Sequence, residues 1–317
     1  MILGPGMYPG VPFADYLAQP AVSAGLLKVI VNECPRAAWF ESWLNPARTP
    51  DNSHASDVGS IAHAILLEGS TAGVAVIDPE NYPSKTGTVP AGWTTKDIRA
   101  ARDDARAVGK IPVLLPDMLL IENMVDSARH YIDGLKDSEP AIYAAFQPDG
   151  GASEQTCIWQ EDGMTCRMRP DRLANDRKLI VDIKTTQRSA EPALWSRTQM
   201  GPLGYWISAS WYRRGCQRVF GQAPEYRFLV IQQDSPHLCS LVGVDPAGFD
   251  HGGMQVEYGL RVWRDCMARS YWPGYPARTV FPEVMPWDLA RAQEQYGVDE
   301  SGIPYDPAVL YGEREPA

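Results

Sequence analysis

Two carboxylates and a lysine lie close together in one segment of the chain, and their spacing suggests metal-dependent chemistry. The segment covers residues 166–186 and reads CRMRPDRLANDRKLIVDIKTT. The side chains at positions 179, 181 and 183 are all apolar, and those at the alternate positions 180, 182 and 184 include the charged residues. This period of two predicts a β-strand with one apolar face and a second face that carries Asp182 and Lys184.

A turn at residues 175–177 would pair this strand with the residues that precede it. The letters NDR at these positions have the composition of a turn, and the chain before them also has a strand-like pattern. A turn centred between residues 176 and 177 places Asp171 opposite Asp182. The same register places Arg169 opposite Lys184. Side chains directly opposed on one face have Cβ atoms about 5 Å apart, whereas a slip of one residue would separate them.

Asp171 and Asp182 repel each other in this arrangement, and a divalent cation would relieve the repulsion. Mg²⁺ prefers oxygen ligands and is usually held by one or two carboxylates together with waters and substrate phosphates. Lys184 would then orient or activate a water and stabilise charge on a phosphate. Because so short a motif also arises by chance, an exposed hairpin with cross-strand ion pairs is the structural alternative.

The rest of the chain must supply the elements that hold this hairpin in place. Apolar periodicity and capping residues predict helices at 23–33, 36–44, 60–68, 95–108, 116–135, 203–215 and 246–270. Strands are predicted within 153–185 and at 227–232, further strands and a long loop within 74–98, and a polar loop at 45–57. The order of helices and strands around 150–235 favours an α/β fold.

Composition and charge narrow the class of protein. The 317 residues are 44% apolar and 21% charged, which is typical of one or two globular domains and excludes a chain that is disordered as a whole, a collagen-like repeat and a coiled coil. The six cysteines form no CxxC pair, which argues against a zinc or iron–sulfur site and fits a reduced cytoplasm. No secretory signal is recognised, and no apolar run of about 18 residues predicts a membrane span.

The charge is unevenly distributed along the chain. The formal net charge of −10 argues against a nonspecific nucleic-acid coat. Residues 167–188 nevertheless carry seven basic and three acidic side chains, whereas residues 283–317 carry two basic and eight acidic ones. A basic working face is therefore compatible with an acidic protein, although charge runs are most often solvated surface.

Several segments occur in an order that carries a family resemblance. They are PAVSAGLLKVIVNECPRAAWF, GSIAHAILLE, Glu154 before a strand, RMRPDRL followed by IVDIKTT, the helix GYWISASWY, and WPGY followed by MPWDLA. In this order they resemble the PD-(D/E)xK nuclease superfamily, and within it the RecE/exonuclease VIII-like, RecB-type phage exonucleases. The resemblance covers residues 20–290. It implies an α/β fold with a restriction-endonuclease-like core, in which helices flank a central mixed β-sheet.

The resemblance also implies roles for individual positions. Asp171 and Asp182 would be the metal-binding acids and Lys184 the motif lysine. His63 would correspond to the helix histidine found near the metal in RecB-type nucleases. Glu154 would correspond to a catalytic acid at the edge of the site.

A further set of positions is expected to contact DNA, namely Arg169, Arg172, Tyr212 and Ser208. Many family members carry glutamine where this chain has Ser208, and a serine is too short to make the same amide contact.

Glu68 lies five residues after His63, about one and a half turns along an α-helix. It is therefore predicted to face elsewhere on the helix and to be structural.

The function implied by the resemblance is that of a Mg²⁺-dependent exodeoxyribonuclease, with Mn²⁺ able to substitute. Such an enzyme would degrade one strand of linear double-stranded DNA, from 5′ to 3′, in the cytoplasm of a bacterial host. The expected partners are DNA ends, further copies of the chain in a ring, and a single-strand annealing protein that serves phage or prophage recombination. The alternatives are an endonuclease with the same core and a non-catalytic DNA-binding or assembly protein that kept the fold.

Three parts of the chain are distinguished on this basis. Residues 1–20 are predicted to form an N-terminal arm, residues 21–291 the exonuclease domain, and residues 292–317 an acidic C-terminal tail. The tail has glycines and prolines among its acids, and such a composition cannot bury enough surface to offset its ordering entropy. Truncation after Arg291 is therefore expected to leave a folded, metal-dependent nuclease.

Overall fold

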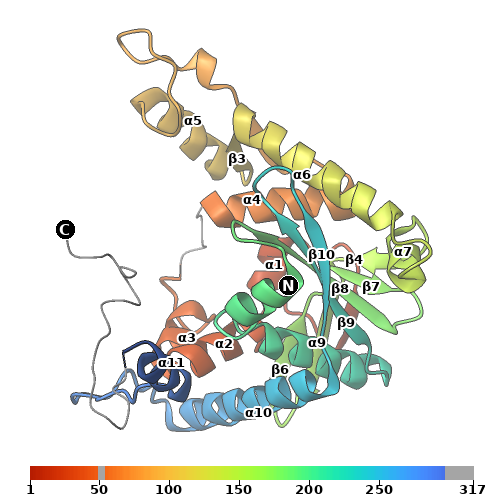
Figure 1. Cartoon of the computed structure of the whole chain (residues 1–317), viewed down its shortest axis with the longest axis vertical. Helices are drawn as coiled ribbons and strands as arrows, with labels where there is room; N and C mark the ends of the chain where they lie inside the picture. The colour runs from red at the N-terminus through yellow and green to blue at the C-terminus, as the bar shows by residue number, and fades with distance from the viewer. Residues whose placement is uncertain (49–53, 297–317) are drawn as a thin grey trace, which may run out of the picture. The chain divides into compact units, whose positions relative to one another are not determined.

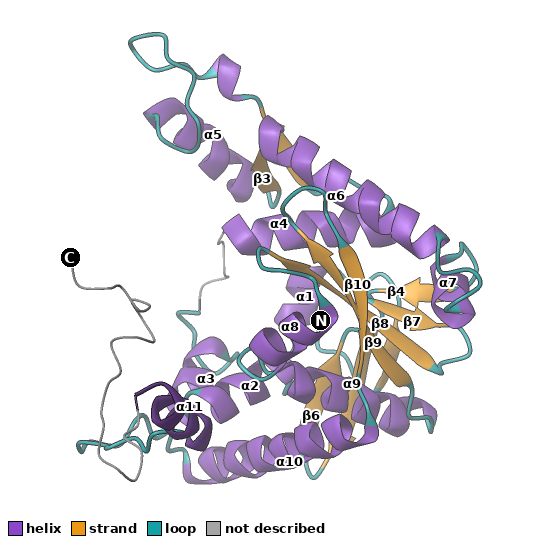
Figure 2. Cartoon of the chain, viewed as in Figure 1, coloured by secondary structure: helices purple, strands orange, loops and turns teal. Residues whose placement is uncertain are grey.

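The computed structural model describes residues 1–48 and 54–296 of the chain (Figure 1; Figure 2). Its contacts divide the chain into two units, Met1–Gly274 and Tyr275–Ala317. The second unit contains α11 (Pro286–Tyr296), so the boundary predicted after Arg291 falls within a helix. The rest of the predicted tail, residues 297–317, lies outside the described residues.

A five-stranded mixed sheet forms the centre of the first unit. Its order is β10-β9-β8-β7-β4, and its strands are β4 (Gly151–Ser153), β7 (Arg172–Ala174), β8 (Leu179–Thr186), β9 (Glu225–Gln232) and β10 (Cys239–Gly243). β8 and β9 are parallel, whereas the other neighbours are antiparallel. The central strand β8 is the one that carries Asp182 and Lys184, so both residues are held by a strand with a neighbour on each side.

Helices cover both faces of this sheet (Figure 1). One face is covered by α4 (His54–His63), α6 (Leu115–Asp133) and α7 (Pro140–Phe146). The other is covered by α9 (Tyr205–Phe220), against which α2 (Ala24–Asn32) and α10 (Pro246–Arg269) pack. Val181 and Ile183 of β8 belong to the apolar core beneath α4, α6 and α7, whereas Ile180 belongs to the apolar core on the α9 side. Because side chains alternate along a strand, Asp182 shares the α9 face with Ile180.

Smaller elements complete the first unit. A three-stranded antiparallel sheet has the order β1-β5-β6, with β1 (Gly6–Tyr8), β5 (Thr156–Glu161) and β6 (Met164–Met168). A parallel pair, β2 (Val74–Ile77) and β3 (Ile111–Leu114), packs with α5 (Lys96–Ala107) at the top of Figure 1. The remaining helices described in this unit include α1 (Phe13–Leu17), α3 (Pro35–Glu41) and α8 (Pro192–Trp195).

The long helices lie close to the positions that periodicity predicts. α6 and α10 agree with the expected 116–135 and 246–270, and the Thr95 hydroxyl caps α5 by accepting a hydrogen bond from the Ile98 N–H at 3.3 Å. The loop predicted at 45–57 is shorter than expected, because α4 already begins at His54. Within the described residues, no helix has both the length and the apolar character needed to cross a membrane.

The strand expected before the turn is divided in two. β6 ends at Met168 and pairs with β5, whereas β7 begins at Arg172 and pairs with β8. Pro170 lies between them, and proline has no N–H with which to continue a ladder. The β7–β8 ladder therefore ends before Arg169, so the predicted pairing of Arg169 with Lys184 is not formed.

The first twenty residues, expected to be an arm, are packed into the first unit. β1 pairs with β5, which places Met7 opposite Cys157. The Arg167 Nη1 donates hydrogen bonds to the carbonyl oxygens of Leu17 and Gln19, both at 2.9 Å. Since Arg167 is itself buried in β6, it fixes the end of this segment to the β1-β5-β6 sheet.

Candidate active site

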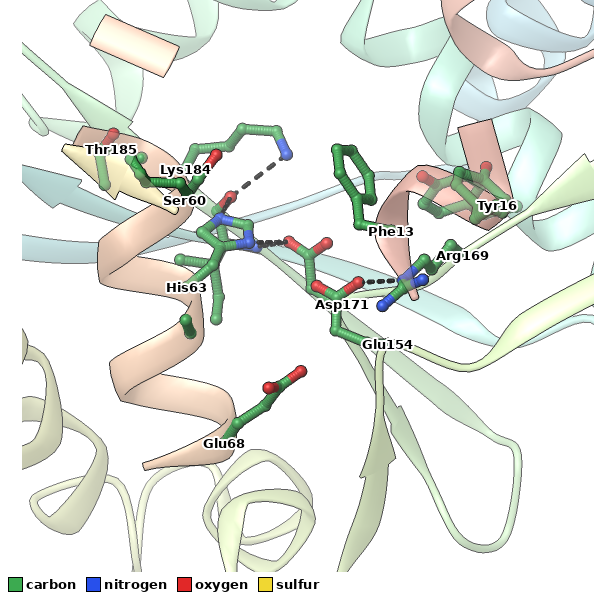
Figure 3. Close-up of a pocket in the computed structure, with 15 residues that line it drawn as sticks. Phe13, Tyr16, Ser60, His63, Glu68, Glu154, Arg169, Asp171, Lys184 and Thr185 are labelled. Atoms are coloured by element: carbon green, nitrogen blue, oxygen red, sulfur yellow. Dashed lines mark hydrogen bonds and ion pairs between the residues drawn. The ribbon is translucent and has the colours of Figure 1, made fainter. Parts of the chain in front are cut away.

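A cavity of about 530 Å³ lies beside the hairpin formed by β7 and β8 (Figure 3). A cavity of this size is in the range that holds small ligands. Its walls come from α1, from α4 and the turn that follows it, from β8 and from α9. The residues predicted from the sequence that line it are His63, Glu154, Arg169, Asp171, Lys184 and Tyr212.

The hairpin brings the two aspartates together in the predicted register. The β7–β8 ladder pairs Arg172 with Val181. The next position therefore places Asp171 opposite Asp182. Asp171 Oδ2 also accepts a hydrogen bond from the Ile183 N–H at 2.7 Å, which fixes its carboxyl group against the backbone of β8.

Two facing buried carboxyl groups cannot easily both be ionised. Asp171 is 8% exposed and Asp182 is 3% exposed. Burial and the negative charge of Asp182 raise the pKa of Asp171 well above its ordinary value. Burial also opposes ionisation of Asp182, but the Lys184 ammonium and hydrogen bonds from neighbouring groups outweigh it and lower the pKa of Asp182. Asp182 is thus the member of the pair that ionises more readily, and a bound metal cation would favour ionisation of Asp171.

Asp182 is held by two donors, Lys184 and Tyr226. The Lys184 Nζ donates to Oδ1 at 2.5 Å, and the Tyr226 hydroxyl donates to Oδ2 at 2.9 Å. Burial alone would lower the pKa of Lys184, but the charges of Asp182 and Asp171 raise it above its ordinary value. Lys184 therefore remains an ammonium group at neutral pH, suited to stabilise negative charge rather than to accept a proton.

His63 presents one ring nitrogen to the site. Its Nε2 lies 2.9 Å from the carbonyl oxygen of Ile183. Because a carbonyl can only accept a hydrogen bond, Nε2 carries the proton and Nδ1 keeps its lone pair. Nδ1 lies 3.7 Å from Asp171 Oδ2. Burial and the nearby charge of Lys184 lower the pKa of His63 to about 4, so the ring is neutral. A metal-binding histidine is commonly oriented in this way, with its other nitrogen bonded to a backbone carbonyl.

His63, Glu154 and Asp171 form a cluster with metal-ligand spacing. Each offers one ligand atom, and the three atoms lie within 4.8 Å of one another. The two carboxylate oxygens suit Mg²⁺ or Mn²⁺, and the imidazole nitrogen is a ligand more typical of transition metals. The residues therefore fit a divalent cation. Asp182, also predicted to bind the metal, is not part of this group of three, and its two oxygens accept hydrogen bonds from Lys184 and Tyr226.

Glu154 reaches the cluster through an uncommon backbone conformation. Its φ of 52° lies in the left-handed region, which non-glycine residues rarely adopt and which is found at functional sites. The Arg169 Nε donates a hydrogen bond to Glu154 Oε2. Burial raises the pKa of Glu154 even though the charge of Arg169 opposes the shift. Arg169 thus orients the carboxyl group without removing its tendency to hold a proton.

Glu68 lines the same cavity, so its predicted orientation away from His63 is wrong. Ala64–Glu68 forms a π-helical turn directly after α4. Hydrogen bonds in a π-helix join residues five apart, so residues five apart lie on similar sides, unlike those in an α-helix. The sequence GSIAHAILLE contains no glycine or proline after the histidine that would indicate this change of geometry.

Two of the predicted DNA contacts lie away from the cavity. Arg172 is buried, and its guanidinium donates to the carbonyl oxygens of Ala145 and Gln147 at 2.7 Å and 3.0 Å. Ser208 is buried on α9 and is not among the residues that line the cavity. Tyr212, one turn further along α9, does line it.

Several residues of the site were not singled out from the sequence. Phe13 and Tyr16 of α1 line the cavity. Tyr226 is opposite Ile180 in the parallel β8–β9 ladder, so it shares the face of Asp182. Lys28 of α2 lies 4.9 Å from the centre of the Tyr205 ring, and burial together with the charge of Lys184 lowers its pKa to about 8. Alternation along 225–232 could have indicated Tyr226, but no local pattern links residues 13–28 to the hairpin.

The fold and this site define a PD-(D/E)xK-type chain. Residues 23–279 match the family described as a PDDEXK-like domain of unknown function (DUF3799), and the chain belongs to this family. No curated protein matches the sequence. The mixed sheet flanked by helices is the restriction-endonuclease-like core expected for the superfamily.

One solved structure shows the same fold at low sequence identity. A protein from Eubacterium rectale described as a candidate exonuclease is 13% identical, with a TM-score of 0.54 over 89% of this chain and 98% of that chain. An alkaline exonuclease from Laribacter hongkongensis is also 13% identical, over 56% of this chain and 86% of that chain, but its TM-score of 0.24 is too low to indicate a shared fold. Family, fold and site together support a nuclease.

Proposed function

We propose that the protein is a Mg²⁺-dependent exodeoxyribonuclease that hydrolyses phosphodiester bonds from the ends of duplex DNA. The observation that carries the proposal is the metal-ligand spacing of His63, Glu154 and Asp171 in a cavity that also holds Lys184. A structural hairpin with exposed cross-strand ion pairs would have no reason to bury two facing aspartates beside a neutral histidine.

Each of these residues has a separate task in the proposed reaction. Nδ1 of His63 and the carboxylates of Glu154 and Asp171 would hold the cation. Bound Mg²⁺ would supply positive charge to the phosphate and lower the pKa of a water. Asp182 keeps Lys184 protonated and positioned, and the ammonium group stabilises the negative charge that develops on the phosphate. Mn²⁺ has the same ligand preferences and is expected to substitute.

The finer parts of the proposal are supported by the resemblance to RecE-like exonucleases. They are 5′-to-3′ polarity, a ring-shaped homo-oligomer, and cooperation with a single-strand annealing protein in phage or prophage recombination. The description of the Eubacterium rectale protein favours an exonuclease over an endonuclease.

The test compares linear duplex DNA with covalently closed circular DNA, in Mg²⁺, in Mn²⁺ and in EDTA. An exonuclease degrades only the linear DNA, and only with metal. Degradation of both substrates would show an endonuclease, and binding without degradation of either would show a non-catalytic DNA-binding protein. Labels placed separately at the 5′ and 3′ ends report the polarity, because the label at the attacked end is released first.

A further inference from the structure

Phe13 presents its aromatic ring to the active-site cavity while remaining largely open to solvent. The residue is 58% exposed and lines the same cavity as His63 and Asp171. Figure 3 shows its ring on the side of Arg169 and Tyr16, across from His63. The ring therefore contributes little to the core and is available to a bound ligand.

Contacts on one side hold the ring in place. The Tyr16 ring is stacked near it, with centroids 6.2 Å apart and an angle of 25° between the planes. The guanidinium carbon of Arg169 lies 5.7 Å from the centre of the Phe13 ring. Since Arg169 also hydrogen-bonds Glu154, one arginine connects the exposed ring to the group of metal-binding residues.

The segment that carries Phe13 is fixed at both ends. Before it, β1 pairs with β5, and the Arg169 Nη1 donates to the Val11 carbonyl at 2.7 Å. After it, the Arg167 guanidinium binds the carbonyl oxygens of Leu17 and Gln19. A ring held this firmly loses little conformational freedom when a ligand stacks on it.

We propose that Phe13 is a stacking platform for a nucleobase of the DNA strand that is cleaved. The inference rests on the proposed nuclease function, because a phosphate bound by Lys184 and by a cation at Asp171 would bring an adjacent base into the same cavity. Aromatic side chains stack on any base, so this contact favours strand binding without reading sequence. This stacking contact gives residues 1–20, predicted from the sequence to be an arm, a role in substrate binding.

The decisive experiment combines removal of the ring with removal of the base. Duplexes that carry an abasic residue at one of the first three nucleotides of each end are compared with intact duplexes, using kcat/KM in Mg²⁺. Phe13→Ala is expected to lower kcat/KM on intact DNA about tenfold, the scale of one base–aromatic stack. In the wild type, an abasic residue at the stacking position should cause a similar loss. In Phe13→Ala it should cause no further loss, and equal losses in both proteins would overturn the proposal.

Two more variants separate stacking from packing. Phe13→Trp retains an aromatic face and should keep wild-type kcat/KM, whereas Phe13→Leu keeps apolar contact with Tyr16 but should behave like Phe13→Ala. Wild-type kinetics of Phe13→Leu would show a packing role and contradict the proposal. Phe40→Ala is the matched control, because Phe40 is 61% exposed on α3 and does not line the cavity.

A binding measurement in EDTA distinguishes failure of the stacking from failure of the nuclease function. Duplexes with 2-aminopurine at the same positions should lose fluorescence on binding the wild type, Phe13→Trp and Phe40→Ala, but not Phe13→Ala. A wild type that quenches the probe without degrading DNA in Mg²⁺ supports the stacking and contradicts the nuclease. A wild type that degrades DNA with quenching independent of residue 13 contradicts the stacking alone.

Discussion

Glu161 and Asp171 are both buried carboxyl groups, but the surrounding protein neutralises only the first. The oxygens of Glu161 accept hydrogen bonds from Trp159 Nε1 at 3.1 Å, Arg214 Nε at 2.9 Å and Arg218 Nη2 at 2.7 Å. Burial alone would raise the pKa of Glu161, but the hydrogen bonds from Arg214, Trp159 and Arg218 lower it to about 2.

Asp171 has the opposite electrostatic environment. His63, whose Nδ1 lies 3.7 Å from Asp171 Oδ2, is neutral and brings no positive charge, and the β7–β8 register places Asp182 opposite Asp171. Its pKa is therefore raised, whereas that of Glu161 is lowered. Both carboxyl groups are buried, so burial alone does not explain why their pKa values shift in opposite directions. The difference between them is the positive charge nearby, and a buried carboxyl group that lacks it indicates a place for a cation or substrate. On this comparison we propose a structural role for Glu161 with its two arginines and a functional role for Asp171.

The largest expected effect comes from removing the charge of Asp171. Asp171→Asn should reduce nuclease activity by about 10³-fold or more, because it removes a metal ligand. The asparagine can still accept the Ile183 N–H, so the melting temperature in EDTA should change little. Mg²⁺ should raise the melting temperature of the wild type but not of the variant, because binding to the folded state alone stabilises it. A variant that keeps both its activity and its response to Mg²⁺ would exclude Asp171 as a ligand.

The reciprocal variant, Glu161→Gln, should lose stability and keep activity. Arg214 keeps its ion pair with Glu257, but the variant removes the buried carboxylate that binds both Arg214 and Arg218, and the free energy of unfolding should fall by about 3 kcal/mol. Urea denaturation measures the loss, and nuclease assays well below the transition midpoint measure the activity. If Glu161→Gln instead lost activity without losing stability, the division between a structural and a functional carboxylate would be wrong.

Lys184→Met should lower the cleavage rate by about 10²-fold, the effect of losing one electrostatic donor in an active site. Methionine keeps most of the aliphatic stem, so the fold should be preserved. DNA binding, measured by fluorescence anisotropy in EDTA, should change little if the ammonium acts mainly on charge that develops during the reaction. Normal cleavage combined with weak binding would instead make Lys184 a simple phosphate contact.

The smallest expected effect is the fall in the free energy of unfolding as the pH is lowered and Glu161 becomes protonated. Its folded pKa of about 2 lies below its ordinary value, so its contribution is present above pH 4.5 and is lost as the pH falls toward 2. Between pH 6 and pH 3 the loss should be about 2 kcal/mol. Unfolding of the wild type and of Glu161→Gln across this range isolates the contribution, because the variant has no carboxyl group to titrate. Parallel pH profiles would show that the arginines do not stabilise the ionised form.

The hairpin was predictable because its information is local. The alternation of β8, the turn letters NDR and the two acids at fixed distances from the turn are sufficient to place Asp171 opposite Asp182, and the β7–β8 ladder has this register. The same local reasoning was wrong for Arg169, because Pro170 divides the strand. For Glu68 it assumed α-helical geometry where the chain forms a π-turn.

By itself, the sequence determined the class of fold, the long helices and the pair of aspartates, since periodicity and turn composition act over a few residues. The tertiary structure decided which charges meet. It turns the Arg172 guanidinium toward backbone carbonyl oxygens and joins Arg169 to Glu154. It also brings Phe13 to a cavity lined by His63 and Asp171, which are 50 and 158 positions away in the sequence. These contacts depend on the packing of elements that are distant in sequence, and no local pattern of side chains contains that information.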